Sequence, residues 1–287
     1  MLGRLRDLLR VEPLRRTLRE KAQRAVADVV EPTLSANAAR LDQLEREVAE
    51  LREKDLPELR EHLAAQNREL LERLVEFEVR TRRDIVYAND QDVVRDTSRF
   101  VAENLAQSSR FAHPSETLEH ALSLAPQDGM ALEFGVYHGE TLSVIARHRT
   151  GPVYGFDSFQ GLPEDWRRGF PAGSFDVDGI PRVEGADLVV GWFADTLPGF
   201  LDAHPGPVDF LHVDGDLYSS ARTVLELVGP RLRPGSVVVF DEFFNFPGWR
   251  EHEFRAWHEH VAATGVRYRY EAYTYSDEQV VLRITTE

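Results

Sequence analysis

The stretch ALEFGVYHGETL, residues 131–142, ends an apolar run with an acid and continues through a glycine-containing turn into an amphipathic segment. Gly135 and Gly139 permit a tight turn and a close approach of a ligand to the backbone. A dinucleotide-binding turn has the pattern G-x-G-x-x-G, but Tyr137 occupies its second glycine position. A pyrophosphate would be crowded there, so the turn disfavours NAD. The acid before the turn, Glu133, instead suits a ligand that carries positive charge.

Beyond residue 126, short apolar runs alternate with amphipathic stretches, a pattern typical of a mostly parallel sheet with helices on both faces. The fold class predicted is therefore α/β. The last two runs are separated only by residues 276–278, so we expect them to form an antiparallel hairpin. Seven strands are predicted, from the runs MALEFG, PVYGFD, DLVVGW, PVDFLHVD, SVVVFDEF, RYRYEAYTY and QVVLRIT.

Ligands of open α/β sheets bind at the carboxyl ends of the strands. The second strand ends in Asp157, where a carboxylate can accept both hydroxyls of a ribose. The third ends in Trp192 and Phe193, whose flat faces suit an adenine. S-adenosylmethionine has both a cationic amino-acid group, which Glu133 would suit, and a ribose, which Asp157 would suit, so the two acids together predict this ligand. The alternatives are that Glu133 is a helix cap and that Trp192 belongs to the core.

Acids gather at the ends of two neighbouring strands. Asp214 and Asp216 end one strand, and Asp241 and Glu242 end the next. Like charges this close repel unless a cation or shared protons compensate. Oxygen ligands favour Mg²⁺. The alternative interpretation is that Asp214-Gly215-Asp216 is only a turn and Asp241 a helix cap.

The segments ALEFGVYHGETL, GFDSFQGLPEDW, GWFADTLP, LHVDGDLYSS and PGSVVVFDEF resemble, in this order, the motifs of the macrocin O-methyltransferase family. Members are class I S-adenosylmethionine-dependent enzymes that methylate sugar hydroxyls of natural products and require magnesium. The resemblance covers about residues 100–287 and implies a Rossmann-like core. It also implies that Asp214, Asp241 and Glu242 bind the metal, although this chain has Asp-Glu where the family usually has Asp-Asp. The cofactor site predicted on these motifs comprises Glu133, Gly135, Val136, Tyr137, Gly139, Thr141, Asp157, Ser158, Trp192 and Phe193.

A sugar hydroxyl is a poor nucleophile at neutral pH, and Mg²⁺ lowers the pKa of an oxygen that it binds. Our hypothesis is that Asp216 takes the hydroxyl proton as general base. Rival bases are histidines: His212 lies within a strand, and His138 follows the first cofactor glycine. His252 and His258 fall on an expected surface helix, where a solvated role is predicted.

Residues 158–186 interrupt the alternation of strands and helices. Five glycines and three prolines make a regular element improbable, and loops of this length are usually lids or binding loops. The aromatic residues of the segment are expected either to cover a ligand or to form a small core of their own.

Residues 34–85 are rich in Glu, Arg and Leu, with apolar residues such as Leu41, Leu44, Val48 and Leu51 at heptad spacing. This pattern predicts a coiled coil that needs a partner, and we expect a homo-oligomer. The register slips before Pro57, where a kink or break is expected. Two domains are predicted, 1–86 and 87–287.

Composition limits the function further. Residues 1–30 carry eight basic and four acidic groups, so −19 of charge lies in the remainder, and an acidic body of this kind disfavours nucleic acid. The basic segment is expected to pack on its own protein or, alternatively, to contact an anionic membrane. With no cysteine and no apolar stretch of membrane-spanning length, a cytoplasmic location is expected, peripheral to the membrane in that alternative. Two alternatives to a methyltransferase stay open. One is a metal-dependent glycosyltransferase in which Asp-Gly-Asp binds a nucleotide sugar through the metal, and the other is a non-catalytic coiled-coil scaffold.

Overall fold

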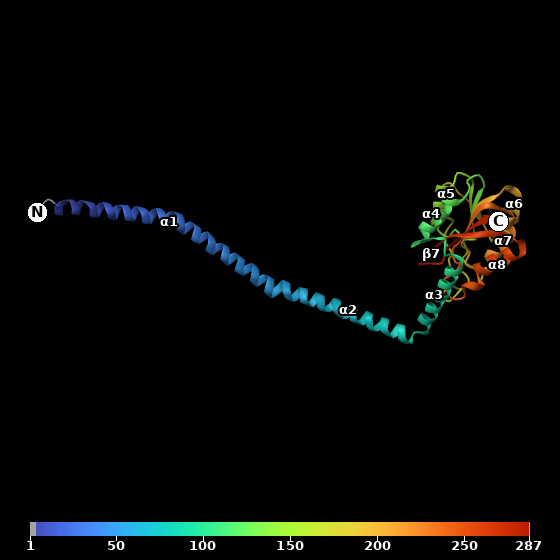
Figure 1. The fold of residues 1–287 in the computed structure, drawn as a ribbon, viewed down its shortest axis with the longest axis horizontal. Helices are drawn as coiled ribbons and strands as arrows, with labels where there is room; N and C mark the ends of the chain where they lie inside the picture. The colour runs from blue at the N-terminus through green and yellow to red at the C-terminus, as the bar shows by residue number, and fades with distance from the viewer. Residues whose placement is uncertain (1–3, 287) are drawn as a thin grey trace. The chain divides into compact units, whose positions relative to one another are not determined.

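The computed structural model describes the backbone of residues 4–286 and the side chains from residue 12 onward. Contacts divide the chain into two units between Arg83 and Asp84, and each is described by itself. Unit 1 consists of α1 (Arg4–Glu50), the π-helical turn η1 (Leu51–Asp55) and α2 (Leu56–Arg83), which continue into one another as a bent rod (Figure 1). The irregularity predicted before Pro57 is thus a π-turn rather than a break.

The rod exposes its apolar side chains. In the described part of the basic segment, Leu14 and Leu18 are 64% and 60% exposed, and no other described element of unit 1 covers them. The side chains of residues 1–11, which also belong to that predicted segment, lie outside the described ones. Among the described residues, no helix combines the length and apolar character that crossing a membrane requires.

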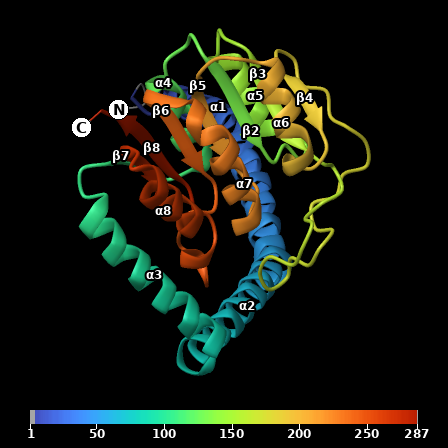
Figure 2. The ribbon, with the colours of Figure 1, turned by 90° about the vertical axis from the view of Figure 1, so that its right-hand side faces the viewer.

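Unit 2 alternates strands and helices around one sheet (Figure 2). It begins with α3 (Ile85–Asn104), β1 (Ser109–Phe111), α4 (Pro114–Leu124), β2 (Met130–Phe134), α5 (Glu140–His148), β3 (Val153–Asp157) and β4 (Asp187–Val190). It continues with α6 (Phe193–Ala203), β5 (Val208–Val213), α7 (Tyr218–Val228), β6 (Leu232–Phe240), α8 (Glu253–Thr264), β7 (Arg267–Thr274) and β8 (Val280–Thr285), with short 3₁₀ turns at Gly229–Arg231 and Trp249–Glu251.

The strand order is β1-β7-β8-β6-β5-β2-β3-β4. Strand β8 is antiparallel to both of its neighbours, and every other pair is parallel. The seven predicted strands and the terminal hairpin are confirmed. An eighth strand, β1, was not predicted because a three-residue segment between two helices carries no readable periodicity.

Two apolar cores lie on the two faces of the sheet. Alternate residues of one strand enter different cores: Phe210 packs with α4 and α5, whereas Leu211 packs with α6, α7 and α8. All six residues of β5 are buried, as expected for a parallel strand covered on both faces. The order of the strands reverses at β2, which lies between β3 on one side and β5 on the other. The carboxyl ends of β2 and β5 therefore flank the point at which this architecture places a ligand.

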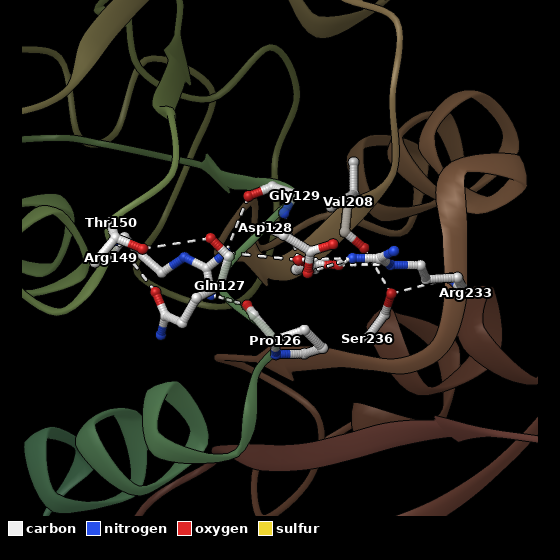
Figure 3. Close-up of polar contacts among 10 residues, drawn as sticks. Pro126, Gln127, Asp128, Gly129, Arg149, Thr150, Val208, Arg233 and Ser236 are labelled. Atoms are coloured by element: carbon white, nitrogen blue, oxygen red, sulfur yellow. Dashed lines mark hydrogen bonds and ion pairs between the residues drawn. The ribbon is translucent and has the colours of Figure 1, made fainter.

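A partly buried ionic network joins the amino-terminal ends of β2, β5 and β6, at the end of the sheet opposite to the carboxyl ends of these strands (Figure 3). The carboxylate of Asp209, fully buried at the start of β5, accepts hydrogen bonds from Gly129 N at 2.5 Å and Arg233 Nε at 2.9 Å. The guanidinium of Arg149 lies 3.9 Å from the same carboxylate and donates to Gly129 O at 3.0 Å. The loop before β2, the end of α5 and the start of β6 are thereby joined through one acid.

We predict that Asp209→Asn destabilises unit 2 by about 3–5 kcal/mol, because it leaves a buried guanidinium without its countercharge. Urea unfolding followed by tryptophan fluorescence measures this, since all four tryptophans lie in unit 2. Asp128→Asn is the matched control: it removes an exposed acid that pairs with the same Arg233 at 2.7 Å, and it should change stability little. Equal effects of the two variants would contradict the prediction.

Candidate active site

A cavity of about 400 Å³ opens at the carboxyl ends of the central strands, and its volume is within the range of small-molecule sites. The ends of β2, β3, β5 and β6 form its floor, α6 and α7 its wall, and the loop after β3 its roof. Of the predicted site residues, it is lined by Gly135, Tyr137, Asp157, Ser158, Trp192, Phe193, Asp214, Asp216 and Glu242. The predicted residues Glu133, Val136, Gly139, Thr141 and Asp241 lie around this cavity but are not among those that line it.

The glycine turn has left-handed backbone at three positions: Gly135 (φ 98°), Tyr137 (φ 47°) and Gly139 (φ 80°). A Cβ on Gly135 would stand 1.7 Å from the carbonyl oxygen of Asp214. Glycine is therefore required at residue 135 by the neighbouring strand end, and not only by the approach of a ligand. A Cβ on Gly139 would stand 2.6 Å from a methyl group of Val183, which belongs to the roof loop.

The carboxylate of Asp157 holds the same turn. One oxygen accepts hydrogen bonds from Val136 N at 2.8 Å and Tyr137 N at 2.9 Å, and the other accepts from Phe159 N at 2.7 Å. The acid predicted to bind a ribose thus also fixes the backbone on both sides of the cavity, while remaining part of the cavity lining.

Beneath the cavity floor, His212 connects two acids. Its Nδ1 lies 2.9 Å from Glu133 Oε1, and its Nε2 lies 3.6 Å from Asp241 Oδ1. Burial opposes a charged imidazole, but Asp241 and Glu133 together raise the pKa of His212 well above its ordinary value. Burial also raises the pKa of Glu133, with His212 and Thr141 offsetting part of the shift. Glu133 is fully buried and its Oε2 has no hydrogen-bond partner among the described residues.

Of the four acids that follow β5 and β6, three have raised pKa values and one has a lowered pKa. Burial and the charge of Asp241 raise the pKa of Asp214 well above its usual range. The same two causes raise the pKa of Asp216 to about 7 and that of Glu242 well above normal. For Asp241 burial acts in the same sense, yet the hydrogen bond and charge of His212 hold its pKa below normal. Asp241 is thus the acid that stays ionised most readily.

Three side chains of this cluster can reach a common ion. Ligand atoms of His212, Asp214 and Asp241 lie within 4.8 Å of one another. The predicted third acid, Glu242, is not in this group, but it lines the cavity and its buried Oε2 has no hydrogen-bond partner among the described residues. Carboxylates that must otherwise keep protons fit a hard divalent cation. His212 belongs to this group of possible ligands, although from the sequence we considered it only as a rival general base.

The roof loop combines the two alternatives considered for residues 158–186. It folds on itself, since Leu162 N donates to Ser174 O at 2.8 Å and Gly173 N donates to Leu162 O at 2.9 Å. Phe170 also stacks on Phe175 at 5.3 Å. It also covers the cavity, which Leu162 and Phe175 line. Arg167 fastens it: the guanidinium lies 3.9 Å from the ring centre of Trp166 and donates to Glu278 at 3.0 Å.

Several residues of the site were not predicted. Ser219, Ser220 and Thr223 of α7 line the cavity; they directly follow the acidic motif, and that adjacency was the available signal. Glu253, fully buried on α8, accepts a hydrogen bond from Glu242 N at 3.0 Å, a contact across a turn that no sequence pattern reveals.

The solvated role predicted for His252 and His258 is wrong. Both are half-buried, each has a buried ring nitrogen without a hydrogen-bond partner among the described residues, and burial lowers the pKa of both. The helix packs its histidines against the aromatic core, with the ring of His258 4.2 Å from that of Phe254.

Comparison with known proteins identifies the same region. Residues 132–243 match the model of a methyltransferase domain. The chain is 37% identical over 162 residues to 8-demethyl-8-(2,3-dimethoxy-alpha-L-rhamnosyl)-tetracenomycin-C 4'-O-methyltransferase of Streptomyces olivaceus, covering 45% of this chain and 59% of that protein. It is 29% identical over 176 residues to mycinamicin III 3''-O-methyltransferase of Micromonospora griseorubida, covering 49% and 67%. The chain thus spans less than two thirds of the first relative. A solved structure of a calicheamicin methyltransferase is 24% identical, with a TM-score of 0.48, and covers 58% of this chain and 76% of its own.

We predict that the metal-free protein loses thermal stability as the pH rises from 5 to 8. The raised pKa values of Asp216, Glu242 and Glu253 mean that the folded state keeps protons that the unfolded state releases above about pH 4. This stabilisation is complete below about pH 4 and is lost as the pH rises through the folded pKa, which is about 7 for Asp216. Scanning fluorimetry should show the melting temperature falling by at least about 2–4 °C.

Adding Mg²⁺ should recover more of the melting temperature at pH 8 than at pH 5, because a cation replaces the protons. Asp216→Asn removes one of the titrating groups and should flatten the profile. The lowered pKa values of His252 and His258 act in the opposite sense over this range, so the comparison with Asp216→Asn isolates the acid. A profile that Asp216→Asn leaves unchanged would show that Asp216 is not protonated in the folded state.

Proposed function

We propose, from the match of residues 132–243 to the model of a methyltransferase domain and from the resemblance of the motifs to the macrocin O-methyltransferase family, that the protein transfers a methyl group from S-adenosylmethionine to a sugar hydroxyl of a natural product or glycan. The observation that carries this proposal is that the glycine turn after β2 and the acids after β5 line one cavity. The relative from Streptomyces olivaceus is named for a rhamnosyl-bearing substrate, which supports a sugar as the acceptor.

We assign the donor to the side of the cavity formed by the glycine turn. Tyr137, Asp157 and Ser158 line this side, and Trp192 and Phe193 close it with two aromatic faces. S-adenosylmethionine supplies the methyl group as a sulfonium, and Glu133, with an unpaired buried oxygen below the turn, contributes negative charge to that region. Gly139 N donates to Val136 O at 2.7 Å and closes the turn, and the side chain of Thr141 hydrogen-bonds Glu133.

We assign the metal to Asp214, Asp241 and Glu242, with His212 holding Asp241 in place. A Mg²⁺ ion bound there would lower the pKa of the acceptor hydroxyl and orient it. The acids of the cluster would then be ionised, and the positive charge of His212 would offset part of their repulsion. The buried side chain of Leu162, in the roof loop, lines the cavity and would help to exclude water from the transfer site.

We propose Asp216 as the general base. Its side chain is 8% exposed, it lines the cavity, and its pKa of about 7 suits proton transfer near neutral pH. The acceptor oxygen would lose its proton to the Asp216 carboxylate as it forms its bond to the methyl carbon, while the bond from that carbon to sulfur breaks and S-adenosylhomocysteine leaves as a neutral thioether. The backbone of Asp216 is left-handed (φ 58°).

Asp216→Asn should lower methyl transfer by about 10²–10⁴-fold while leaving the affinity for S-adenosylmethionine unchanged, because only the proton acceptor is lost. Asparagine tolerates the left-handed backbone, so the fold is preserved. Transfer is measured by mass spectrometry of glycan acceptors and affinity by calorimetry. Asp202→Asn, an exposed acid at the far end of α6, is the control. A fully active Asp216→Asn variant would rule out the assignment.

Ligand specificity separates this function from the glycosyltransferase and scaffold alternatives. S-adenosylmethionine at about 100 times its Kd should stabilise the protein by about 2.7 kcal/mol and raise its melting temperature. A UDP-sugar with Mn²⁺ should not. The opposite result favours a glycosyltransferase, and no shift with either favours a scaffold. Dialysis against EDTA should abolish transfer, and Mg²⁺ should restore it.

We further propose that residues 87–287 carry the catalytic function and residues 1–86 mediate self-association. Contact of the basic segment with an anionic membrane is the alternative role for residues 1–30. Flotation with phosphatidylserine vesicles tests it: recovery of the protein with the vesicles at low salt supports membrane contact, and its absence excludes it.

A further inference from the structure

We propose that residues 34–70 pair with the same segment of a second copy of this chain as a parallel, in-register coiled coil, and that the π-turn η1 keeps the apolar seam continuous across the pair. This inference concerns unit 1 and does not depend on the proposed enzymatic function. It assigns an occupant, an orientation and a register to an apolar face that is exposed in the single chain.

The seam has two parts. In α1 its residues follow the alternating spacing of three and four that places them along one face of a helix. They are Leu41, Leu44, Val48 and Leu51, which are 60%, 48%, 44% and 51% exposed. In α2 the same spacing resumes with Leu56, Leu59 and Leu63, which are 44%, 53% and 48% exposed, and it continues through Gln66 to Leu70.

Between the two parts the spacing is wrong for an α-helix. Leu51 and Leu56 are five residues apart, where the heptad calls for four. In a regular α-helix one additional residue turns the following face by about 100°, so the two parts would point in different directions. A two-stranded pairing would then end at Leu51.

The π-turn compensates for the additional residue. It spans Leu51–Asp55, and the backbone N–H of Leu56 donates to Leu51 O, a bond that encloses one residue more than the α-helical one. The widened turn absorbs the additional residue and returns Leu56 to the face of Leu51. The insertion in the sequence and the change in helix type thus fall at the same place.

Charges beside the seam favour parallel, in-register pairing. In such a pair, with Leu41 and Val48 at position a of the heptad, a residue at position g of one chain faces the residue five positions later, at position e, of the other chain. Arg40 then faces Glu45 of the second copy, and Glu47 faces Arg52 of the second copy. The two-fold symmetry repeats both contacts.

The antiparallel arrangement is disfavoured by the same residues. An antiparallel pair centred on Leu41–Leu51 brings equivalent flanks together, so Glu45 would face Glu45, and Glu47 would face Glu47. Arg40 would face Lys54. All of these are repulsive, and flanking charges are the features that select orientation in coiled coils. In the parallel pair the like-charged contact is Lys54 with Arg60, across η1, where the pairing is therefore weakest.

The chain contains no cysteine, so disulfide cross-linking of single-cysteine variants of the full chain tests the proposal. A parallel, in-register pair brings the two copies of residue 44 within the short Cβ separation a disulfide needs. Leu44→Cys should therefore give covalent dimer on mild oxidation, roughly ten-fold more than Arg46→Cys, which lies on the opposite face. Equal yields from both variants, or a monomer by light scattering at tens of micromolar, would overturn the proposal.

The continuity of the seam through η1 has its own test. Leu63→Cys, in α2, should cross-link as efficiently as Leu44→Cys, and Glu61→Cys on the outer face should not. Cross-linking of Leu44→Cys without Leu63→Cys would show that the pairing stops at the π-turn, which overturns the role assigned to it. An antiparallel pair centred on Leu41–Leu51 would link neither variant to its own copy.

Discussion

The contact between Gly135 and the carbonyl oxygen of Asp214 is the constraint on which the site depends. No side chain fits at residue 135, because its Cβ would overlap that oxygen. Backbone hydrogen bonds hold the contact from both sides: Gly135 N donates to Phe156 O at 2.9 Å, and Asp214 N donates to Phe134 O at 2.8 Å. The turn assigned to the methyl donor and the acids assigned to the metal are therefore parts of one rigid backbone framework. Their separation is set by the sheet and not by flexible side chains.

A second link between the two halves of the site lies below the floor. His212 contacts Glu133 of β2 and Asp241 after β6, so one buried positive charge serves an acid near each proposed ligand. Burying such groups is costly unless their charges compensate one another. The opposite pKa shifts of the acids follow from this arrangement: the hydrogen bond and charge of His212 lower the pKa of Asp241, whereas burial and the charge of Asp241 raise the pKa values of Asp214 and Glu242.

Much of the fold was predictable because most strands can be recognised from their own short stretch of sequence. Apolar runs ending in acids or glycines gave seven strands, the terminal hairpin and the residues that meet at one edge of the sheet. What sequence could not give were contacts that depend on register and on rotamers. Glu133 was expected beside the ligand; it is fully buried and does not line the cavity, and the pairing of β2 with β5 places it next to His212. Glu253 reaches Glu242 from a helix after an irregular turn, and no periodicity relates the two. The three-residue β1 is too short to carry a pattern.

The fastening of the roof loop has a consequence for how molecules enter and leave. Arg167 is held by an ion pair with Glu278 and by the faces of Trp166 and Phe246, at 3.9 and 4.7 Å. Glu278 and Phe246 belong to two segments outside the roof loop, whereas Trp166 directly precedes Arg167, so opening the loop for the proposed acceptor would require Glu278 and Phe246 both to release Arg167. Opening of this kind commonly limits the turnover of enzymes whose chemistry is fast. Because part of the fastening is electrostatic and solvent-accessible, ionic strength would adjust the rate of passage without touching the reacting groups.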